Sequence, residues 1–128
     1  MIQQKIVLDY TKDPELFNQT ALDWAKKIGR GVKNTQIRFF YDQVLKLYEQ
    51  SKPMDENDFK KDFLPFVKML NSKVAYAKTR KSDGKPLINN AFAGMISSCI
   101  EQQKTKSDLK VFKLFFESVI GFHKGLDS

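Results

Sequence analysis

The stretch SDLKVFKLFFESVIGFH, from Ser107 to His123, decides the fold class of this chain. Its apolar residues recur every three or four positions, which is the period of an α-helix with one buried face. Ser107 and Asp108 are residue types that accept hydrogen bonds from the free N–H groups of a helix N-terminus. The stretch therefore predicts a helix that starts at these two residues. Its predicted core-facing residues are Leu109, Phe112, Phe116, Val119 and His123.

Two helices are predicted in the first half of the chain. Asp13 followed by Pro14 starts the first, because proline fits the first turn of a helix without losing a useful donor. A glycine of the segment 29–31 ends it. Thr35 is predicted to cap the second helix, which ends at the Ser51–Pro53 break. The predicted apolar faces are Phe17, Ala21, Trp24 and Ile28 in the first helix, and Ile37, Phe40, Tyr41, Val44 and Tyr48 in the second.

The third predicted helix begins near Asp55 and keeps helical spacing as far as Ala77. Pro65 falls inside it and removes one backbone hydrogen bond, so we expect either a kink there or two helices joined near residues 61–64. A turn is expected at residues 82–86, followed by a fourth helix. The apolar face of the third helix comprises Phe59, Phe63, Phe66, Val67, Leu70, Val74 and Ala77, and that of the fourth comprises Ile88, Phe92, Met95, Ile96 and Cys99.

Together these patterns predict an all-α fold, a single compact bundle of about five helices with a short N-terminal arm. A chain of 128 residues is long enough for one hydrophobic core but hardly for two. We therefore expect an arm over residues 1–12 and one helical domain over residues 13–128. The longest apolar run of the arm, Ile6–Leu8, is too short for a membrane span, and the single Cys99 cannot form an internal disulfide. We expect a cytoplasmic protein without membrane contact.

Catalytic motifs are scarce, and we expect a protein that is not an enzyme and has no cofactor, catalytic residue or metal site. The chain contains no GxGxxG or GxxxxGKS/T phosphate motif, no HExxH and no CxxC. Asp55, Glu56 and Asp58 are predicted to lie in the first turn of a helix, where carboxylates interact favourably with the helix dipole. A small hydrolase or nuclease that uses these three residues with His123 is kept as a distant alternative.

Basic residues are a better guide to function because they are unevenly placed. Twenty-two Lys and Arg against fifteen Asp and Glu leave a formal net charge of +7, which favours polyanionic partners. Residues 26–38 contain five cations and no acidic residue, and residues 68–85 contain six cations and one Asp. The two segments would form one patch if the second and third helices pack side by side.

Lys73, Tyr76 and Arg80 form the strongest candidate site. Their offsets of zero, three and seven place them on one stripe of the third helix, apart from its apolar face. Lysine can neutralise phosphates, arginine can bind two phosphate oxygens at once, and tyrosine can hydrogen-bond to a base or stack on it. A solvated helix face with Tyr76 partly in the core explains the same residues, and both interpretations stay open here.

Three strings in order also give the chain a resemblance to a known family. Thr35-Gln36-Ile37-Arg38 opens a helix that ends Leu47-Tyr48, LNSKVAYAKTR spans Leu70–Arg80, and Phe115-Phe116-Glu117-Ser118 lies near the C-terminus. In this order and spacing, over about residues 33–124, they resemble the small subunit of type III-A CRISPR effector (Csm) complexes. The resemblance implies an all-helical, non-catalytic protein that lies along the guide-containing backbone of such a complex.

The resemblance also implies partners, which are CRISPR RNA and target RNA, the backbone and large subunits of the Csm complex, and neighbouring copies of the chain itself. RNA and DNA cleavage would then belong to the neighbouring subunits, while this chain stabilises the guide and target RNA through a basic face. The main alternative is a helical adaptor or nucleoid-type protein whose basic face binds an acidic partner or duplex DNA. The implied RNA contacts are Lys33, Arg38, Lys73, Tyr76, Lys78 and Arg80.

Overall fold

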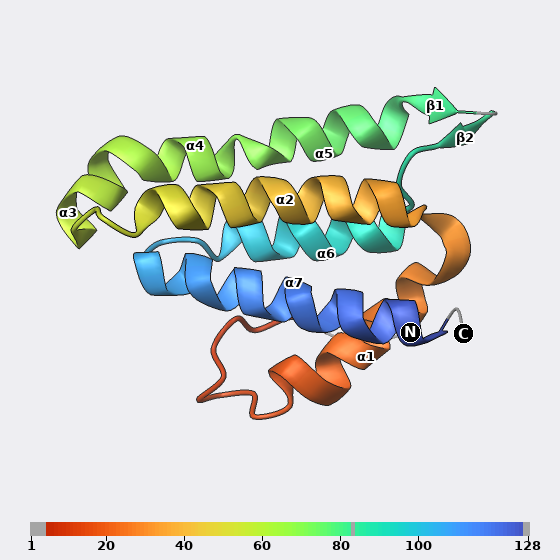
Figure 1. Cartoon of the computed structure of the whole chain (residues 1–128), viewed down its shortest axis with the longest axis horizontal. Coiled ribbons are helices and arrows are strands. Elements are labelled where there is room, and N and C mark those ends of the chain that lie inside the picture. Colours follow the sequence, from red (N-terminus) through yellow and green to blue (C-terminus); the bar gives the residue numbers. More distant parts are fainter. Residues whose placement is uncertain (1–4, 83, 127–128) are drawn as a thin grey trace.

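The computed structural model describes residues 5–82 and 84–126 and confirms the all-α prediction (Figure 1). Two strands, β1 (Lys81–Ser82) and β2 (Lys85–Pro86), pair antiparallel as a small hairpin. The helical elements, in chain order, are the π-helical turn η1 (Leu16–Thr20), α1 (Ala21–Ile28), the 3-10 turn η2 (Gly29–Gly31), α2 (Asn34–Ser51), α3 (Glu56–Asp58), the π-helical turn η3 (Phe59–Phe63), α4 (Leu64–Lys68), α5 (Leu70–Thr79), α6 (Asn90–Glu101) and α7 (Lys106–Leu126).

The long helices run antiparallel to their neighbours in the chain, as short connections require (Figure 1). Helix α7 packs against α1 and α2, and α5 packs against α6. The segment α4–α5 runs alongside α2 at one edge of the bundle, and α1 lies at the opposite edge, next to α7 (Figure 1). None of the described helices is both long enough and apolar enough to cross a membrane.

Helix α7 provides the centre of the core, as its spacing predicts. All five of its predicted core residues are buried, and Phe115 is buried with them. The Phe116 ring lies 5.6 Å from Tyr41 of α2, 6.1 Å from Phe92 of α6 and 6.2 Å from Phe112, measured between ring centroids. Edge-to-face and offset aromatic pairs of this kind add to the stability that burial alone supplies.

Several predicted helix starts differ from the structure. The first helical turn begins at Leu16 and not at Asp13–Pro14, and α6 begins at Asn90, after Ile88. Thr35 is exposed and does not cap α2, which begins at Asn34 after an extended Lys33, with no side-chain cap. Helix α7 begins before Ser107, because the Thr105 hydroxyl accepts the Asp108 N–H at 3.1 Å while the Asp108 carboxylate accepts the Thr105 N–H at 2.9 Å. This reciprocal pair caps two donors at once, which makes Thr105 the stronger start.

The third predicted helix is divided, which settles the choice left open at Pro65. Residues 59–63 form the π-helical turn η3, and α4 begins at Leu64 with Pro65 in its first turn, where no intrahelical donor is lost. A second break at Met69 separates α4 from α5. One predicted core residue is misplaced, since Phe66 is 56% exposed while its neighbour Val67 is buried. The predicted Asp55 cap is confirmed by a 2.8 Å bond from the Asp58 N–H.

The N-terminal segment packs on the bundle through two buried residues, Ile6 and Leu8. The Gln102 side chain binds this segment as a neighbouring strand would. Its Oε1 accepts the Leu8 N–H at 2.9 Å, and its Nε2 donates to the Ile6 carbonyl at 2.8 Å. One amide group therefore satisfies two backbone polar groups of a segment that forms no helix.

Candidate nucleic-acid interface

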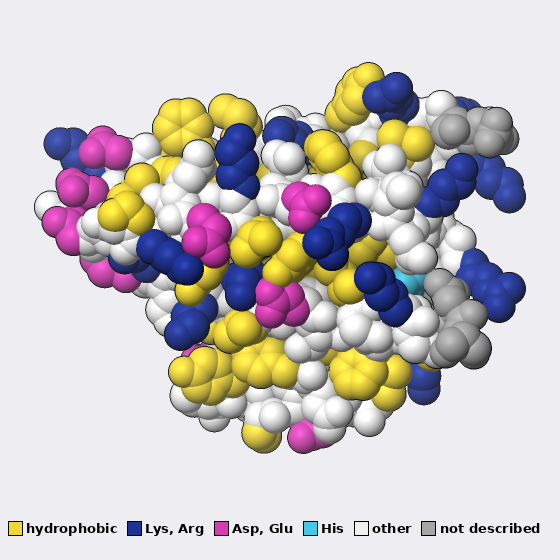
Figure 2. Space-filling view, in the orientation of Figure 1, with side chains coloured by type: hydrophobic (Ala, Val, Ile, Leu, Met, Phe, Trp, Pro, Cys, Tyr) yellow, Lys and Arg dark blue, Asp and Glu magenta, His cyan; other side chains and the backbone are white. Residues whose placement is uncertain are grey.

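Charge is separated along the long axis of the molecule. Acidic side chains gather around α3, while basic side chains predominate at the opposite end, where α2 begins and the hairpin projects (Figure 2). The exposed acidic residues of the first end are Asp55, Glu56, Asp58 and Asp62. The exposed cations of the other end include Arg30, Lys33, Arg80, Lys81 and Lys85. A polyanion would approach the end that carries the hairpin.

The stripe on α5 is exposed, as the functional interpretation requires. Lys73 and Arg80 are exposed, and Tyr76 is 62% exposed, so the alternative in which Tyr76 lies partly in the core is wrong. The Arg80 guanidinium lies 5.8 Å from the centre of the Tyr76 ring, within the range of a cation–π contact. Lys73 Nζ donates to Gln43 Oε1 of α2 at 2.6 Å, which ties the stripe to the neighbouring helix.

The same stripe continues toward the acidic end as an apolar surface. Phe66 and Met69 precede Lys73 at helical offsets, and both are more than half exposed. They border a groove of about 630 Å³ between α2 and the α4–α5 segment. Large exposed apolar side chains in one row mark a surface made for contact, since an isolated bundle gains nothing from them. We call this row the α5 stripe. It comprises Phe66 of α4, Met69 between the two helices, Lys73 and Tyr76 of α5, and Arg80 directly after α5.

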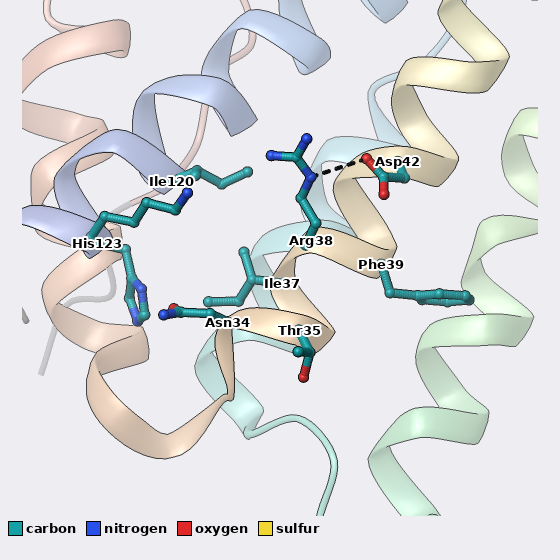
Figure 3. Close-up of a pocket in the computed structure, with 9 residues that line it drawn as sticks. Asn34, Thr35, Ile37, Arg38, Phe39, Asp42, Ile120 and His123 are labelled. Atoms are coloured by element: carbon teal, nitrogen blue, oxygen red, sulfur yellow. Dashed lines mark ion pairs between the residues drawn. The ribbon is translucent and has the colours of Figure 1, made fainter.

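Arg38 lies on a different side of α2, beside a hollow of about 490 Å³ between α2 and α7. Figure 3 shows it directed toward Ile120 of α7, while Phe39 points to the other side of α2. Its Nε lies 3.3 Å from Asp42, and the Arg38 side chain is 61% exposed. Because an exposed pair of this kind is weak, the guanidinium can exchange Asp42 for a phosphate at little cost.

Helices α2 and α7 are held together beneath Arg38 by a polar contact. The Tyr41 hydroxyl donates to the Glu117 carboxylate, which also binds Lys113 at 2.9 Å. Burial raises the pKa of Tyr41 above its usual value, and Glu117 adds to the rise. Burial also raises the pKa of Glu117, but the hydrogen bonds from Tyr41 and Lys113 and the charge of Lys113 together lower it. The carboxylate therefore stays ionised and fixes the side of α2 that presents Arg38.

Lys33 and Lys78 do not join the α5 stripe. Lys33 is exposed and lines a hollow of about 570 Å³ together with Arg30 and Lys85. Lys78 is exposed on the other side of α5, beside a hollow shared with α6 and Glu101. The six candidate residues thus form a stripe of three, an Arg38 position on α2, a cationic hollow with Lys33, and an outlying Lys78.

Some cations of the basic segments are used within the fold. Lys68 Nζ donates to the carbonyls of Ile100 at 2.8 Å and Glu101 at 3.2 Å. The lysine therefore satisfies carbonyls at the C-terminus of α6, where a positive charge is favoured. Desolvation lowers the pKa of Lys68 below its usual value. A side chain bound in this way is not available to a phosphate.

The nuclease alternative needs His123 beside the carboxylates of α3, and the structure separates them. Asp55 caps α3, and Glu56 of the same element accepts the Lys106 N–H at the start of α7. His123 is buried near the other end of α7, where its Nε2 donates to the Gly29 carbonyl at 2.6 Å. Seventeen residues of helix span roughly 25 Å, too far for shared chemistry. The described residues hold no cluster of three or more metal-ligating side chains.

Cys99 behaves as the small hydrophobic residue that its position on an apolar face predicts. Its side chain is completely buried in the core. Burial raises the pKa of the thiol well above its usual value, so the reactive thiolate is suppressed.

Comparison with known protein families gives the family of this basic helical bundle. The model of the Csm2 type III-A family matches residues 11–128, nearly the whole chain. The chain belongs to the Csm2 type III-A family. As a Csm2 protein it is a small subunit of a type III-A CRISPR Csm complex, which it forms with other subunits. No curated protein and no solved structure matches the chain.

Two cations of this Csm2 chain, Arg30 and Lys85, are missing from the residues predicted for the site although they lie beside Lys33. They are separated by more than fifty positions in the sequence, and a single sequence does not reveal that two loops meet. In the structure the segment of Gly31 lies close to Asn89, since a Cβ atom added at Gly31 would lie 2.4 Å from Asn89 Nδ2.

Proposed function

We propose that this chain binds and stabilises CRISPR RNA and target RNA along the backbone of the Csm complex, in the cytoplasm, and catalyses no reaction itself. The observation that carries this proposal is the gathering of exposed cations at one end of a Csm2-family subunit. A guide and target read each other by base pairing, so the protein needs only to contact the phosphate path and the helical shape.

The α5 stripe and Arg38 supply the chemistry for such contacts. Lys73 neutralises a phosphate, and Arg80 can bind two phosphate oxygens at once. Tyr76 can hydrogen-bond to the backbone or stack on a base, and its contact with Arg80 holds the two groups together. Lys33 and Lys78 contribute longer-range attraction from the flanks. Catalysis is left to neighbouring subunits, as the resemblance to the small subunit of Csm complexes implies.

The apolar half of the α5 stripe supports contact with a protein rather than with RNA. Phe66 and Met69 are exposed beside an apolar groove whose rim carries Lys46 and Lys73. A neighbouring Csm subunit, or another copy of this chain, would bury them, while phosphates would not. The stripe therefore combines a protein contact at one end with an RNA contact at the other.

The proposal is tested by titrating a guide–target RNA duplex with the wild-type chain and with Arg38→Ala and Arg80→Ala over a range of salt concentrations. Each lost phosphate contact is expected to lower the slope of log affinity against log salt by about 0.7 to 0.9. Lys60→Ala is the matched control, because Lys60 is an exposed cation at the acidic end. Unchanged slopes in both arginine variants would refute the named contacts.

The adaptor or nucleoid-type alternative is separated by co-purification. Affinity purification of the tagged chain from its native cells is expected to recover guide RNA and the large Csm subunits. Recovery of duplex DNA without either would favour the alternative. An RNA cleavage assay with added divalent metal tests the non-catalytic claim, and cleavage lost in Asp58→Ala would contradict it.

A further inference from the structure

The hollow beside Lys33 has the composition of an anion site. It lies between the α1–α2 connection and strand β2 and has a volume of about 570 Å³. Arg30 and Lys33 come from one wall and Lys85 from the other, and all three are exposed. The remaining lining residues are neutral, namely Gly31, Thr35, Gln36, Pro86 and Leu87. Three cations face this hollow without a carboxylate among its lining residues.

The two walls are fixed to each other by Asn89. Its Nδ2 donates to the Ile28 carbonyl at 2.9 Å, and its Oδ1 accepts the Phe92 N–H at 2.9 Å as the cap of α6. Gly31 makes this contact possible, because a Cβ atom at that position would lie 2.4 Å from Asn89 Nδ2. The segment that carries Arg30 and Lys33 is therefore attached directly to the start of α6, four residues after Lys85.

A second bond holds the same segment from the opposite side. The buried His123 donates from Nε2 to the Gly29 carbonyl at 2.6 Å. Two consecutive carbonyls at the end of α1 are thus satisfied by side chains from α6 and α7. A connection held at both carbonyls keeps the backbone that carries its cations in place before a ligand arrives, which lowers the entropy cost of binding.

We propose that Arg30, Lys33 and Lys85 form a pre-organised pocket for one backbone phosphate of RNA. The inference rests on the proposed RNA-binding function and adds to it a defined phosphate position with two residues outside the predicted set. Arg30 can bind two phosphate oxygens, and the two lysines add point charges from either side. The Thr35 hydroxyl and the first turn of α2 also line the pocket and add donors, but the three cations carry the proposal.

The first test compares Arg30→Gln and Lys85→Gln with Lys81→Gln in RNA duplex titrations. Lys81 is an exposed cation of the same hairpin that does not line the pocket. Each pocket variant is expected to weaken binding by up to about fivefold, which corresponds to about 1 kcal/mol for an exposed ion pair. The control is expected to change affinity by less than either. Equal effects of all three variants would overturn the pocket and leave only a diffuse basic surface.

The second test removes one phosphate charge at a time with neutral methylphosphonate linkages along the duplex. If a phosphate occupies the pocket, neutralising one linkage position costs less affinity with Lys85→Gln than with the wild-type chain, since losses at contacting groups are not additive. Strictly additive losses at every position would refute the assignment. Inorganic phosphate serves as the comparison ligand. If the affinity for inorganic phosphate equals the affinity for RNA per site, the pocket belongs to a free anion instead.

The third test disturbs the pocket without changing its charge. Gly31→Ala displaces Asn89 and is expected to weaken RNA binding as much as Lys85→Gln does. Gly94→Ala is the matched control, because Gly94 is exposed on α6 with no atom near its added Cβ. If the pocket variants bind like wild type while Arg38→Ala and Arg80→Ala still lose affinity, this inference fails and the proposed function stands. If none of these variants loses affinity, both fail.

Discussion

Helices α7 and α5 differ in what their apolar residues contact. On α7 most of the aromatic side chains are in the core, and its Phe112, Phe115 and Phe116 are completely buried. On the α4–α5 segment one row is buried, as at Val67 and Val74, while a second row, the α5 stripe, is exposed. Helix α7 therefore contributes mainly to the core, whereas the α5 stripe faces the solvent.

This difference separates residues that stabilise the bundle from residues that are exposed and can contact a partner. A buried row loses packing when it is truncated, so substitutions there lower the free energy of unfolding. An exposed row loses only solvent contacts, so substitutions there leave stability nearly unchanged and alter binding. Substitutions in α7 and in the α5 stripe are therefore expected to differ in their effect on stability.

Phe116→Ala is expected to have the largest effect. The ring contacts Tyr41, Phe92 and Phe112 at the centre of the bundle, so its removal leaves a cavity. The expected loss is about 3 to 5 kcal/mol in the free energy of unfolding, which urea denaturation measures. A loss below about 1 kcal/mol would mean that α7 is not the centre of the core.

Glu117→Gln is expected to have an intermediate effect, a loss of about 1 kcal/mol at neutral pH. The variant removes the charge that accepts the hydrogen bond from Tyr41 and pairs with Lys113. Because the pKa of Glu117 is lowered in the folded state, its contribution is present above the unfolded pKa and is lost as pH falls through the folded pKa. Urea titrations of both proteins should therefore converge in acid, and a constant difference would contradict the assignment.

Gly121→Ala is expected to stabilise the protein by about 0.5 to 1 kcal/mol, since alanine is the better helix former. Gly121 is exposed on α7, and an added Cβ atom meets nothing within 4 Å. Thermal unfolding measures the change. A destabilisation would show that this outer face of α7 is packed in a way that the exposure of Gly121 does not indicate.

Phe66→Gln and Tyr76→Ala are expected to change the free energy of unfolding by less than about 0.5 kcal/mol. Their effects should appear in binding instead. Phe66→Gln is expected to reduce recovery of other Csm subunits in a pull-down, and Tyr76→Ala to reduce affinity for the RNA duplex. Loss of stability in either variant would place the α5 stripe among the packing residues and end the contrast with α7.

Much of the fold could be predicted because helical period and capping residues are local signals. The core row of α7, the Asp55 cap and the glycine that ends α1 at a φ of +55° all follow from neighbours in the sequence. The exposure of Phe66 could not be predicted in this way. On the α4–α5 segment apolar residues occupy two adjacent rows, and periodicity alone does not say which row meets the rest of the bundle.

The candidate site likewise contains residues that local sequence patterns predict and residues that they do not. The spacing predicted that Lys73 and Tyr76 share an exposed side of α5, because residues three and four apart share a helix face. Arg80 follows the last residue of α5 with an extended backbone, and its guanidinium still lies 5.8 Å from the centre of the Tyr76 ring. Arg30 and Lys85 line the same hollow because two segments far apart in the sequence meet, through the contact of Gly31 with Asn89. Such contacts arise from tertiary packing, and no local rule of sequence contains them.

The amide of Gln102 has a consequence for the order of events during synthesis on the ribosome. The segment with Ile6 and Leu8 is made before α6, and the side chain that binds it lies 94 to 96 positions later. The end of α1 likewise depends on His123, 94 positions after Gly29. During synthesis, Ile6, Leu8 and Gly29 therefore lack these hydrogen-bond partners until α6 and α7 have emerged, so residues that are made early are secured late.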